Sequence, residues 1–530
     1  MLRKKFMSGL ALVLAAAFLF TGCGGEKKTA ETGDKKEVVK ESEEKKENKK
    51  PKILVYARGA DSTGLDPAYV SDGESSKVIV NVCENLVRYK EGTTELEPQL
   101  AESWNISEDG LEYTFNLRKD VKFHDGSDFT ADDVIWSIDR QLEGKRTADM
   151  PYAAFTFEQV KALEKVDDYT VKFVLKEPST PFLANLAMSL AAPIVKKGDN
   201  ISENPVGTGP FKFVSWKKDE SITLEKFNEY WGEGAKVDKV IFKVTKENSV
   251  RASELMTGAV DIIDGISFND VAQLESSQAV VDKANGMNIN YMAFNTDRAP
   301  FNDSKLREAI AHAINRDELV EYLYQGYSEV ASTYLPSFIP GYADDIELYK
   351  YDPEKAKTML KELGKEDLKL KIITYSNPRP YNPAGSKLAE AIQGYLAKVG
   401  VEATIDVYPW KEYKEKALQG EGDLLFFGWI GDNGDADNFL SLLESINAES
   451  GLNSAKFANA DVDALLQKAR TLPNGEERES VYKDVQKLLA IESPWVPLSH
   501  ATDLVAYQKN IEGYQLHPTG RVYLKDVVKK

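Results

Sequence analysis

The C-terminal half of the chain alternates between short apolar runs and longer amphipathic stretches. Strands are predicted at 368–375, 401–408 and 423–427, because each run is short and mainly apolar, as in a buried strand. Helices are predicted between them, at 386–399 and 410–418. This βαβαβ order, with right-handed crossovers, predicts a parallel sheet covered by helices.

Two further helices are predicted ahead of this unit. Asp303 or Ser304 caps the first, whose apolar positions at near-helical spacing are Leu306, Ile310, Ile314 and Leu319. The second starts at Asp352-Pro353, because proline suits the first helical position, and ends at Gly364.

The N-terminal half mixes strands, turns and helices. A strand is predicted at 52–56 and a helix at 75–86. Residues 111–118 alternate as a half-buried antiparallel strand, and Thr130 is the predicted N-cap of a helix. The glycines of 204–211 are predicted to form a tight connection into a strand, because a proline and a strand follow them where a phosphate-binding motif needs a helix.

The first fifty residues have the features of an export and anchoring segment. Three basic residues precede the apolar run 6–20, and Thr21-Gly22-Cys23 resembles a lipobox. We therefore expect a signal peptide at 1–22 and a lipid, including palmitate, on Cys23. Residues 24–50 contain no aromatic residue, so a disordered tether is expected over 23–50. Cys83 then has no disulfide partner and is expected to be a small buried apolar residue.

Size and charge exclude several classes of protein. A chain of 530 residues is too long for one core and should form two or more domains. The formal net charge of −18 argues against nucleic acid and anionic membrane surfaces as partners. No later run of eighteen apolar residues occurs, so the protein is expected to sit on the membrane by its lipid. Motifs of serine hydrolases, zinc proteases and dithiol sites are absent, and the four histidines are scattered.

Opposite charges follow two strands of the predicted parallel sheet. Arg379 lies in the loop after the first strand, and Asp432, Asp435 and Asp437 follow the third. Ligands bind beyond the carboxyl ends of such strands, and in the common strand order the first and third are neighbours. Arg379 and Asp432 are therefore expected in one crevice. The spacing leaves three possibilities open: an internal salt bridge, two solvated charges or a ligand site.

A metal site is not predicted in this loop. Counted from Asp435, the spacing of a calcium-binding EF-hand places Phe439 where the third ligand belongs. Asp435, Asp437 and Asn438 are therefore predicted to cap the backbone and brace the loop.

Four segments resemble the family 5 extracellular solute-binding proteins, the peptide-binding receptors of ABC importers: Ala101–Trp104, Tyr113–Leu117, Val121–Gly126 and Asn204–Phe211. The resemblance runs from about residue 52 to the end. It implies an α/β fold of the type II, cluster C-like class, with two lobes, a hinge and an extra subdomain. The implied ranges are lobe I at 51–288 plus 504–530, its inserted subdomain at about 90–205, lobe II at 289–503, and hinge crossings near 285–292 and 500–506.

Within the family, the Arg-Pro-Tyr-Asn-Pro and Gly-Trp-x-Gly-Asp-Asn-Gly-Asp loops resemble those of dipeptide-binding members. The resemblance implies that Asp432 holds the α-ammonium of a dipeptide and Arg379 its α-carboxylate, since arginine binds carboxylates bidentately. Ile430 departs from the pattern, as does Ala436, and both are expected to be loop positions away from the ligand. The remaining expected site residues are Trp429, Gly428, Gly431, Tyr381, Trp410, Ser71 and Gly73.

The function expected from the sequence is that of a lipid-anchored, monomeric receptor without cofactors. It is expected to capture dipeptides and deliver them to an ABC permease. The alternatives are another cargo on the same fold, namely longer peptides, haem or a nickel chelate, and a secreted peptide hydrolase.

Overall fold

The computed structural model describes residues 50–530 except 347 and 450. The predicted signal peptide and Cys23 lie outside the described residues, as does the tether up to residue 49. Within the described part, no helix is long and apolar enough to cross a membrane.

A mixed sheet of twelve strands runs through residues 51–530, within the described part of the chain. Its order is β16-β15-β17-β13-β18-β11-β1-β10-β9-β8, and β12 and β14 also pair with β18. The bounds of its strands are β1 Ile53–Arg58, β8 Phe211–Lys217, β9 Ser221–Lys226, β10 Lys239–Val244, β11 Ile262–Asp264, β12 Val280–Asn285, β13 Asn288–Phe294, β14 Ser328–Val330, β15 Lys369–Tyr375, β16 Glu402–Tyr408, β17 Leu424–Ile430 and β18 Trp495–Tyr507.

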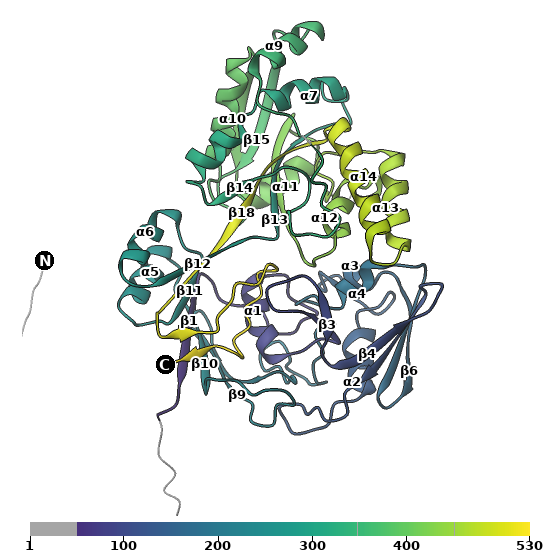
Figure 1. Ribbon diagram of the computed structural model, residues 1–530, viewed down its shortest axis with the longest axis vertical. Helices are drawn as coiled ribbons and strands as arrows, with labels where there is room; N and C mark the ends of the chain where they lie inside the picture. The colour runs from purple at the N-terminus through teal and green to yellow at the C-terminus, as the bar shows by residue number, and fades with distance from the viewer. Residues whose placement is uncertain (1–49, 347, 450) are drawn as a thin grey trace, which may run out of the picture. The chain divides into compact units, whose positions relative to one another are not determined.

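The long strand β18 joins two halves of this sheet (Figure 1). Its first residues pair with β13, next to β17 and β15, and its last residues pair with β12 and β11. We call the half with β13 to β17 lobe II and the half with β1 and β8 to β11 lobe I. The chain also crosses between β12 and β13 at Gly286, where a Cβ would lie 2.7 Å from the Ala501 carbonyl oxygen. Only glycine fits this close crossing.

The βαβαβ prediction for lobe II is confirmed. β15 pairs in parallel with β16 on one side and with β17 on the other, so the first and third strands are neighbours. The helices of this lobe cover the sheet and surround the largest apolar core. Their bounds are α7 Ser304–His312, α8 Arg316–Glu318, η1 Leu319–Leu323, α9 Pro353–Glu362, α10 Lys387–Lys398, α11 Trp410–Leu418, α12 Asp437–Leu440, η2 Ser441–Leu443, η3 Ser445–Asn447, α13 Ala460–Thr471 and α14 Glu476–Glu492.

The helix predicted to include Ile314 and Leu319 is shorter than expected. It ends at His312, and Asn315 starts a new turn by accepting a hydrogen bond from the Glu318 N–H. Asparagine side chains favour such caps over a helix interior. Ile314 and Leu319 are still buried in the core of lobe II, so their apolar spacing reflected burial and not one continuous helix.

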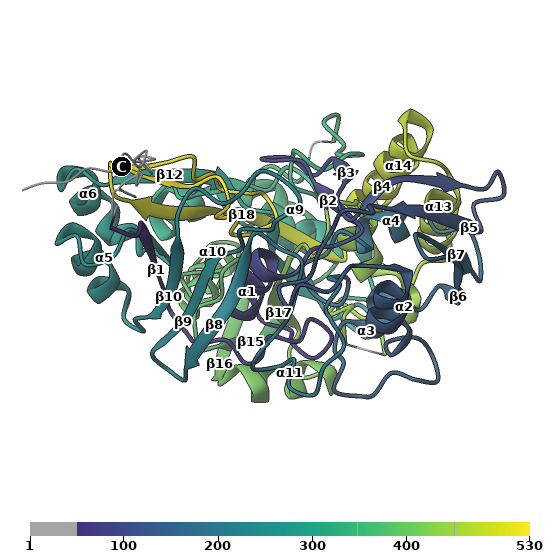
Figure 2. The ribbon, with the colours of Figure 1, turned by 90° about the horizontal axis from the view of Figure 1, so that it is seen from below.

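Lobe I carries an additional four-stranded antiparallel sheet with the order β4-β5-β7-β6 and its own apolar core (Figure 2). We call this sheet, with α2 to α4, the inserted subdomain. Thr130 is the N-cap of α2, as predicted, and it forms a capping box with Asp133. The bounds of the elements of lobe I outside the large sheet are α1 Gly73–Val82, β2 Val87–Tyr89, β3 Leu96–Pro98, β4 Ala101–Ile106, β5 Glu112–Leu117, α2 Ala131–Asp139, α3 Ala153–Phe157, β6 Val160–Asp167, β7 Thr170–Leu175, α4 Pro181–Asn185, α5 Asn248–Met256, α6 Phe268–Ser276, β19 Ile511–Glu512 and β20 Val528–Lys529.

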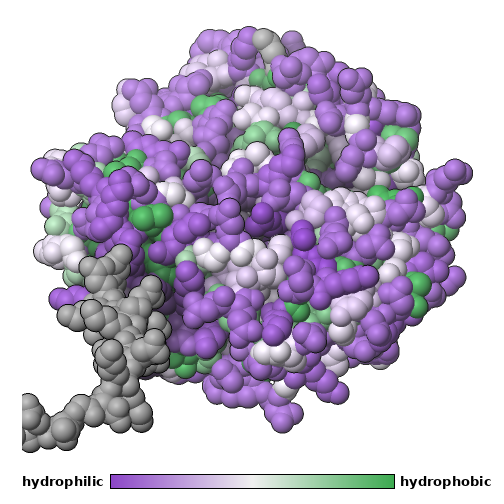
Figure 3. Space-filling model, turned by 60° about the horizontal axis from the view of Figure 1, so that its bottom comes forward, coloured by the Kyte–Doolittle hydropathy of each residue, from purple (hydrophilic) through white to green (hydrophobic). Residues whose placement is uncertain are grey.

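Helix α1 begins two residues before the predicted start and ends four residues before the predicted end. Asp72 is its N-cap, because its carboxylate accepts from the Ser75 N–H at 2.8 Å. Cys83 follows the helix and is buried, as expected. The face drawn in Figure 3 is mostly hydrophilic, with apolar residues scattered among charged ones.

Candidate ligand-binding site

We call the loop that contains Asp432, Asp435 and Asp437 the acidic loop. The strand before it, β17, is longer than the sequence predicted. It does not stop at Phe427 but continues to Ile430, because β13 pairs with it along its whole length, from Phe294↔Leu424 to Asn288↔Ile430. Ile430 is therefore a strand residue, and its assignment to a loop is wrong. The extra residues carry Asp432 past the end of β15 and toward the crossing into lobe I, where the Gly431 N–H donates to the Met287 carbonyl at 2.7 Å.

The two strands that carry Arg379 and Asp432 separate before they end. β15 pairs with β17 only at Ile372↔Leu424 and Ile373↔Leu425. Tyr381 packs beside the separated part of β17, so that a Cβ on Gly428 would lie 2.3 Å from the Tyr381 ring. Gly428 and Tyr381 are thus in close contact, and a side chain at position 428 would prevent this contact.

Arg379 is fixed by stacking and backbone bonds. Its guanidinium carbon lies 4.3 Å from the centre of the Trp410 ring, a distance typical of cation–π contacts. Its backbone exchanges two hydrogen bonds with Asn382, at 3.0 and 2.9 Å. Within the described residues, the buried Nε of Arg379 has no hydrogen-bond partner, and no ion pair of Arg379 is found. The guanidinium is therefore held in place and still has donors to offer.

Asp432 lies half-buried beyond the end of β17. Its backbone N–H donates to Oδ1 of Asn438 at 3.0 Å, and Trp429 Nε1 donates to the same oxygen at 2.8 Å. Its own Oδ1 accepts from the Tyr152 hydroxyl at 2.9 Å. Burial raises the pKa of Asp432 to about 6, against the opposing effects of its hydrogen bonds and of the Arg521 charge.

The internal salt bridge considered for Arg379 and Asp432 is not formed. In the described part of the chain neither residue has an ion pair, and the charge that lowers the pKa of Asp432 is that of Arg521. β15 and β17 are paired only at Ile372↔Leu424 and Ile373↔Leu425, so strand pairing does not join the two loops that follow them. Two opposite charges at one sheet edge are thus each without an ionic partner among the described residues.

The other two aspartates of the loop are structural, as predicted. Asp435 forms a bidentate pair with Arg478, at 2.7 and 2.8 Å, and Asp437 accepts from Arg470 at 2.8 Å. Asp435 also accepts from the Asp437 N–H at 2.9 Å. Both carboxylates therefore meet protein cations and brace the loop.

The predicted lobe I residues lie at the start of α1. Ser71 and Gly73 are exposed, and nothing lies within 4 Å of the position of a Cβ on Gly73. Their contact with a ligand stays a prediction, as do the roles of the other site residues.

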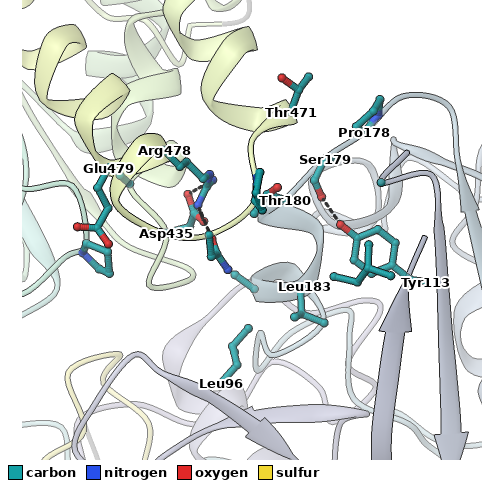
Figure 4. A pocket seen from close by; sticks show the side chains of 18 of the residues that line it. Leu96, Tyr113, Pro178, Ser179, Thr180, Leu183, Asp435, Thr471, Arg478 and Glu479 are labelled. Carbon is teal, nitrogen blue, oxygen red and sulfur yellow. Dashed lines mark hydrogen bonds and ion pairs between the residues drawn. The ribbon is translucent and has the colours of Figure 1, made fainter. Parts of the chain in front are cut away.

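The acidic loop touches lobe I at further points. Asn433 donates to Oδ1 of Asn185 at 2.7 Å, and the Gly434 N–H donates to the Tyr89 hydroxyl at 3.2 Å. On the side of Gly434, Asp435 and Ala436, a cavity of about 780 Å³ lies between the inserted subdomain and the helices α13 and α14 (Figure 4). Its lining includes the Asp435–Arg478 pair but neither Arg379 nor Asp432.

Two residues near Asp432 were not identified from the sequence. Tyr152 comes from the inserted subdomain, 280 residues away. Arg521 is buried, donates to the Ala187 carbonyl at 2.7 Å and lies over the Tyr89 ring. No local motif marks either residue, because both reach Asp432 only through the tertiary fold.

Comparison with known proteins identifies the family. The model for bacterial extracellular solute-binding proteins, family 5 (middle region), matches residues 95–450. The dipeptide-binding protein of Escherichia coli K12 is 35% identical over 508 residues, covering 90% of this chain and 94% of that protein. The haem-binding protein A of Haemophilus influenzae is 37% identical over 499 residues, covering 88% and 90%.

A solved structure agrees with these relatives. The periplasmic binding protein DppA of Helicobacter pylori, in complex with the peptide STSA, has a TM-score of 0.76 and 37% identity, covering 90% of this chain and 98% of that one. The two-lobed α/β fold inferred from the resemblance is confirmed. This chain belongs to the bacterial extracellular solute-binding proteins of family 5.

Proposed function

We propose that this chain captures short peptides, dipeptides first among them, outside the cytoplasm and delivers them to an ABC permease. The observation that carries the proposal is the pair Arg379 and Asp432. These groups have opposite charges, lie beyond neighbouring parallel strands, and have no ionic partner among the described residues. A peptide in solution carries the complementary charges at its two ends.

The charged group at each end of a peptide is complementary to one of these two residues. Arg379, stacked on Trp410, presents a planar set of donors that fits a carboxylate bidentately. Asp432 is half-buried with a raised pKa, so an ammonium group that pairs with it also stabilises its ionised form. Two binding groups at a fixed separation select peptides by length. Each extended residue adds roughly 3.3–3.6 Å to the distance between the charged ends of a peptide.

The location proposed for the protein follows from the same family and from the N-terminus. A signal peptide at 1–22 and a lipid on Cys23 would hold the folded part at the outer face of the membrane. The expected partner is then the permease of an ABC importer, and binding without chemical conversion is the expected activity.

A thermal-shift panel tests the proposal. The probes are Ala-Ala, Ala-Ala-Ala, the tetrapeptide Ser-Thr-Ser-Ala, free alanine, haem and a nickel–histidine complex, with chromatography of the recovered peptides. Ligands that bind the folded state stabilise it by RT ln(1 + [L]/Kd), about 2.7 kcal/mol at a hundredfold excess over Kd. The dipeptide should raise the Tm most and be recovered intact.

Other outcomes assign the site differently. Equal stabilisation by the dipeptide and the tetrapeptide would show that the site does not select peptides by length. Stabilisation by haem or by the nickel–histidine complex, with none by the peptides, would identify a different cargo. Cleaved peptides would make the protein a hydrolase.

Arg379→Ala should abolish the dipeptide-induced rise in Tm. The matched control is Arg298→Ala, which removes a half-exposed arginine paired with Asp423, the residue before β17, and should leave the shift unchanged.

A further inference from the structure

The cavity of about 780 Å³ beside the acidic loop lies outside the proposed peptide site (Figure 4). We call it the interlobe cavity. Gly434, Asp435 and Ala436 of the acidic loop line it, whereas Asp432 and Arg379 do not. Its volume is within the range of about 300–1,000 Å³ that is typical of sites for small molecules. The interlobe cavity is therefore large enough for a second ligand, close to the proposed peptide site but separate from it.

Both lobes contribute to its lining. Lobe I supplies side chains from β3, β4, β5 and α4, and lobe II supplies the acidic loop, the end of α13 and the start of α14. Thr180, which is part of the lining, bonds to lobe II twice. Its N–H donates to the Arg470 carbonyl at 2.9 Å, and its hydroxyl donates to the Leu472 carbonyl at 2.6 Å. The shape of the cavity therefore depends on the position of the two lobes.

Large apolar side chains of lobe I line the cavity, namely Leu96, Trp104, Ile106, Tyr113 and Leu183. Ile106 is 42% exposed at the end of β4, and Trp104, on the same strand, is half-buried. The Tyr113 hydroxyl already donates to the Ser179 carbonyl at 3.1 Å. An apolar surface of this kind favours the apolar part of a ligand, because contact removes it from water.

The one basic residue of the lining, within the described part of the chain, is Arg478. Its guanidinium pairs with both carboxylate oxygens of Asp435, at 2.7 and 2.8 Å. It also donates to Oδ1 of Asn474 at 2.9 Å, to the Tyr482 hydroxyl at 2.6 Å and to the Ala469 carbonyl at 2.9 Å. These bonds use all of the N–H donors of an arginine. An anion in the cavity would therefore meet no free cation.

The acidic residues of the lining are less well compensated. Glu479, in the first turn of α14, is half-buried, and Glu108, after β4, is exposed. No ion pair of either residue is found among the described residues. Asp109 and Glu95 also line the cavity, and Glu95 pairs with Lys90. The excess of carboxylates makes the cavity favourable for a cation.

We propose that the interlobe cavity binds an amphipathic organic amine, a small molecule with an apolar body and an ammonium group on an alkyl chain. In Figure 4, Arg478 and Glu479 lie on one side of the cavity, and Leu96, Leu183 and Tyr113 of lobe I lie on the other. The apolar body packs on the residues of lobe I, and the ammonium pairs with Glu479. The inference does not depend on the peptide function, because none of the residues proposed to bind the peptide lines this cavity.

Fluorescence titration of the full chain with three probes tests the chemistry of the site. Dansylcadaverine joins an aromatic body to an alkylammonium group. N-dansyl-6-aminohexanoate has the same body with a carboxylate, and cadaverine has the charge without the body and is measured by competition. Dansylcadaverine should bind saturably and about tenfold or more tightly than either of the others, because only it matches both the apolar and the acidic residues. Equal binding of the two dansyl compounds, or no saturable binding, would overturn the inference.

Two variants in one helical turn locate the ammonium. Glu479 and Glu477 both lie in the first turn of α14, but Glu477 is exposed and does not line the cavity. Glu479→Gln should weaken dansylcadaverine binding about three- to fivefold, as for the loss of one partly exposed ion pair. Glu477→Gln should leave it unchanged. Equal losses in the two variants would mean that only the overall charge attracts the probe, which would overturn the site.

A second pair of variants locates the apolar body. Ile106→Ser should weaken both dansyl compounds, because it removes an apolar side chain from the lining. Val166→Ser is the control, since Val166 is 58% exposed on β6 of the same sheet and does not line the cavity. Wild-type affinity in Ile106→Ser would show that the body binds elsewhere.

The peptide site is separated from the interlobe cavity by competition. Ala-Ala should not displace dansylcadaverine, and Arg379→Ala should bind dansylcadaverine with the wild-type Kd. Displacement by Ala-Ala, or loss of amine binding in Arg379→Ala, would place the amine in the peptide site and overturn the inference. If the wild type binds dansylcadaverine but no peptide, the proposed function fails and the second site stands.

Discussion

Three carboxylates within six residues of one loop have three different environments. Asp435 is matched by a bidentate arginine, Asp437 by a second arginine, and Asp432 only by a tyrosine hydroxyl and a more distant charge. The first two stabilise the loop. Asp432 keeps a charge that the fold does not neutralise, which is the property a binding group needs.

Replacing Asp432 by asparagine should abolish dipeptide binding without weakening the unliganded fold. The raised pKa means that the folded state binds a proton more tightly than the unfolded chain does, so ionised Asp432 lowers stability increasingly as the pH rises from about 4 to about 6. Asparagine removes this penalty, which at pH 7.5 amounts to at most about 3 kcal/mol. Urea unfolding of both proteins at pH 7.5 and 4 measures it, and a destabilised variant would show that Asp432 has a structural role instead.

Replacing Arg478 by methionine should lower the free energy of unfolding, unlike the replacement of Asp432 by asparagine. It leaves Asp435 buried without its cation, and the loss of one partner of a buried pair is expected to lower the free energy of unfolding by about 3–5 kcal/mol. Lys357→Met, at an exposed pair with Glu354, is the control and should change it by about 0–1 kcal/mol. Chemical denaturation measures both, and similar small effects would mean that Asp435 does not depend on Arg478.

At the scale of elements, the site depends on the separation of two strands. β17 follows its antiparallel neighbour β13 and leaves its parallel neighbour β15 after two paired positions. The loops after β15 and β17 are therefore not joined by strand pairing, and Arg379 and Asp432 form no ion pair with each other among the described residues. Tyr381 occupies part of the separation, against Gly428.

Gly428→Ala tests this arrangement. The added methyl would lie 2.3 Å from the Tyr381 ring and 2.5 Å from the Ile289 carbonyl oxygen, so Tyr381 and the backbone of β13 must shift. We expect a loss of about 1–3 kcal/mol in stability, typical of overpacking, together with weaker dipeptide binding. Gly394→Ala, in α10 with nothing within 4 Å of its Cβ, should be neutral or stabilising. Thermal melts and calorimetry compare the two, and equal behaviour would refute the packing argument.

The sequence predicted elements whose signals are local. Asp352-Pro353 and Gly364 bound α9 as expected, and Thr130 caps α2. It did not predict the extension of β17, because β13, the strand responsible, lies more than a hundred residues earlier. Tyr152 was missed for the same reason. Arg379 and Asp432 were identified because each follows a recognisable strand. The sequence around Tyr152 does not indicate which loop it contacts.

For the whole molecule, contacts between the lobes predict where ligand-induced closure is measurable. The Thr180 N–H donates to the Arg470 carbonyl at 2.9 Å, from the inserted subdomain to α13. Hydrogen exchange at this amide should slow when Ala-Ala is added, because closed lobes protect it. The Gly209 N–H, bonded to the Val82 carbonyl within lobe I, is the control and should not change. Equal rates at Thr180 with and without peptide would show that the lobes do not move.

The strand β18 also has a consequence for how the protein reaches its folded state. It is a central strand of both lobes, yet it comes after almost all of their other strands in the sequence. During synthesis, neither lobe can complete its sheet until residues 495–507 have emerged, so the nascent chain stays incompletely folded until late. That delay suits a chain that crosses a membrane before it folds. A chain truncated before Trp495 would lack β18 and therefore a central strand of both lobes.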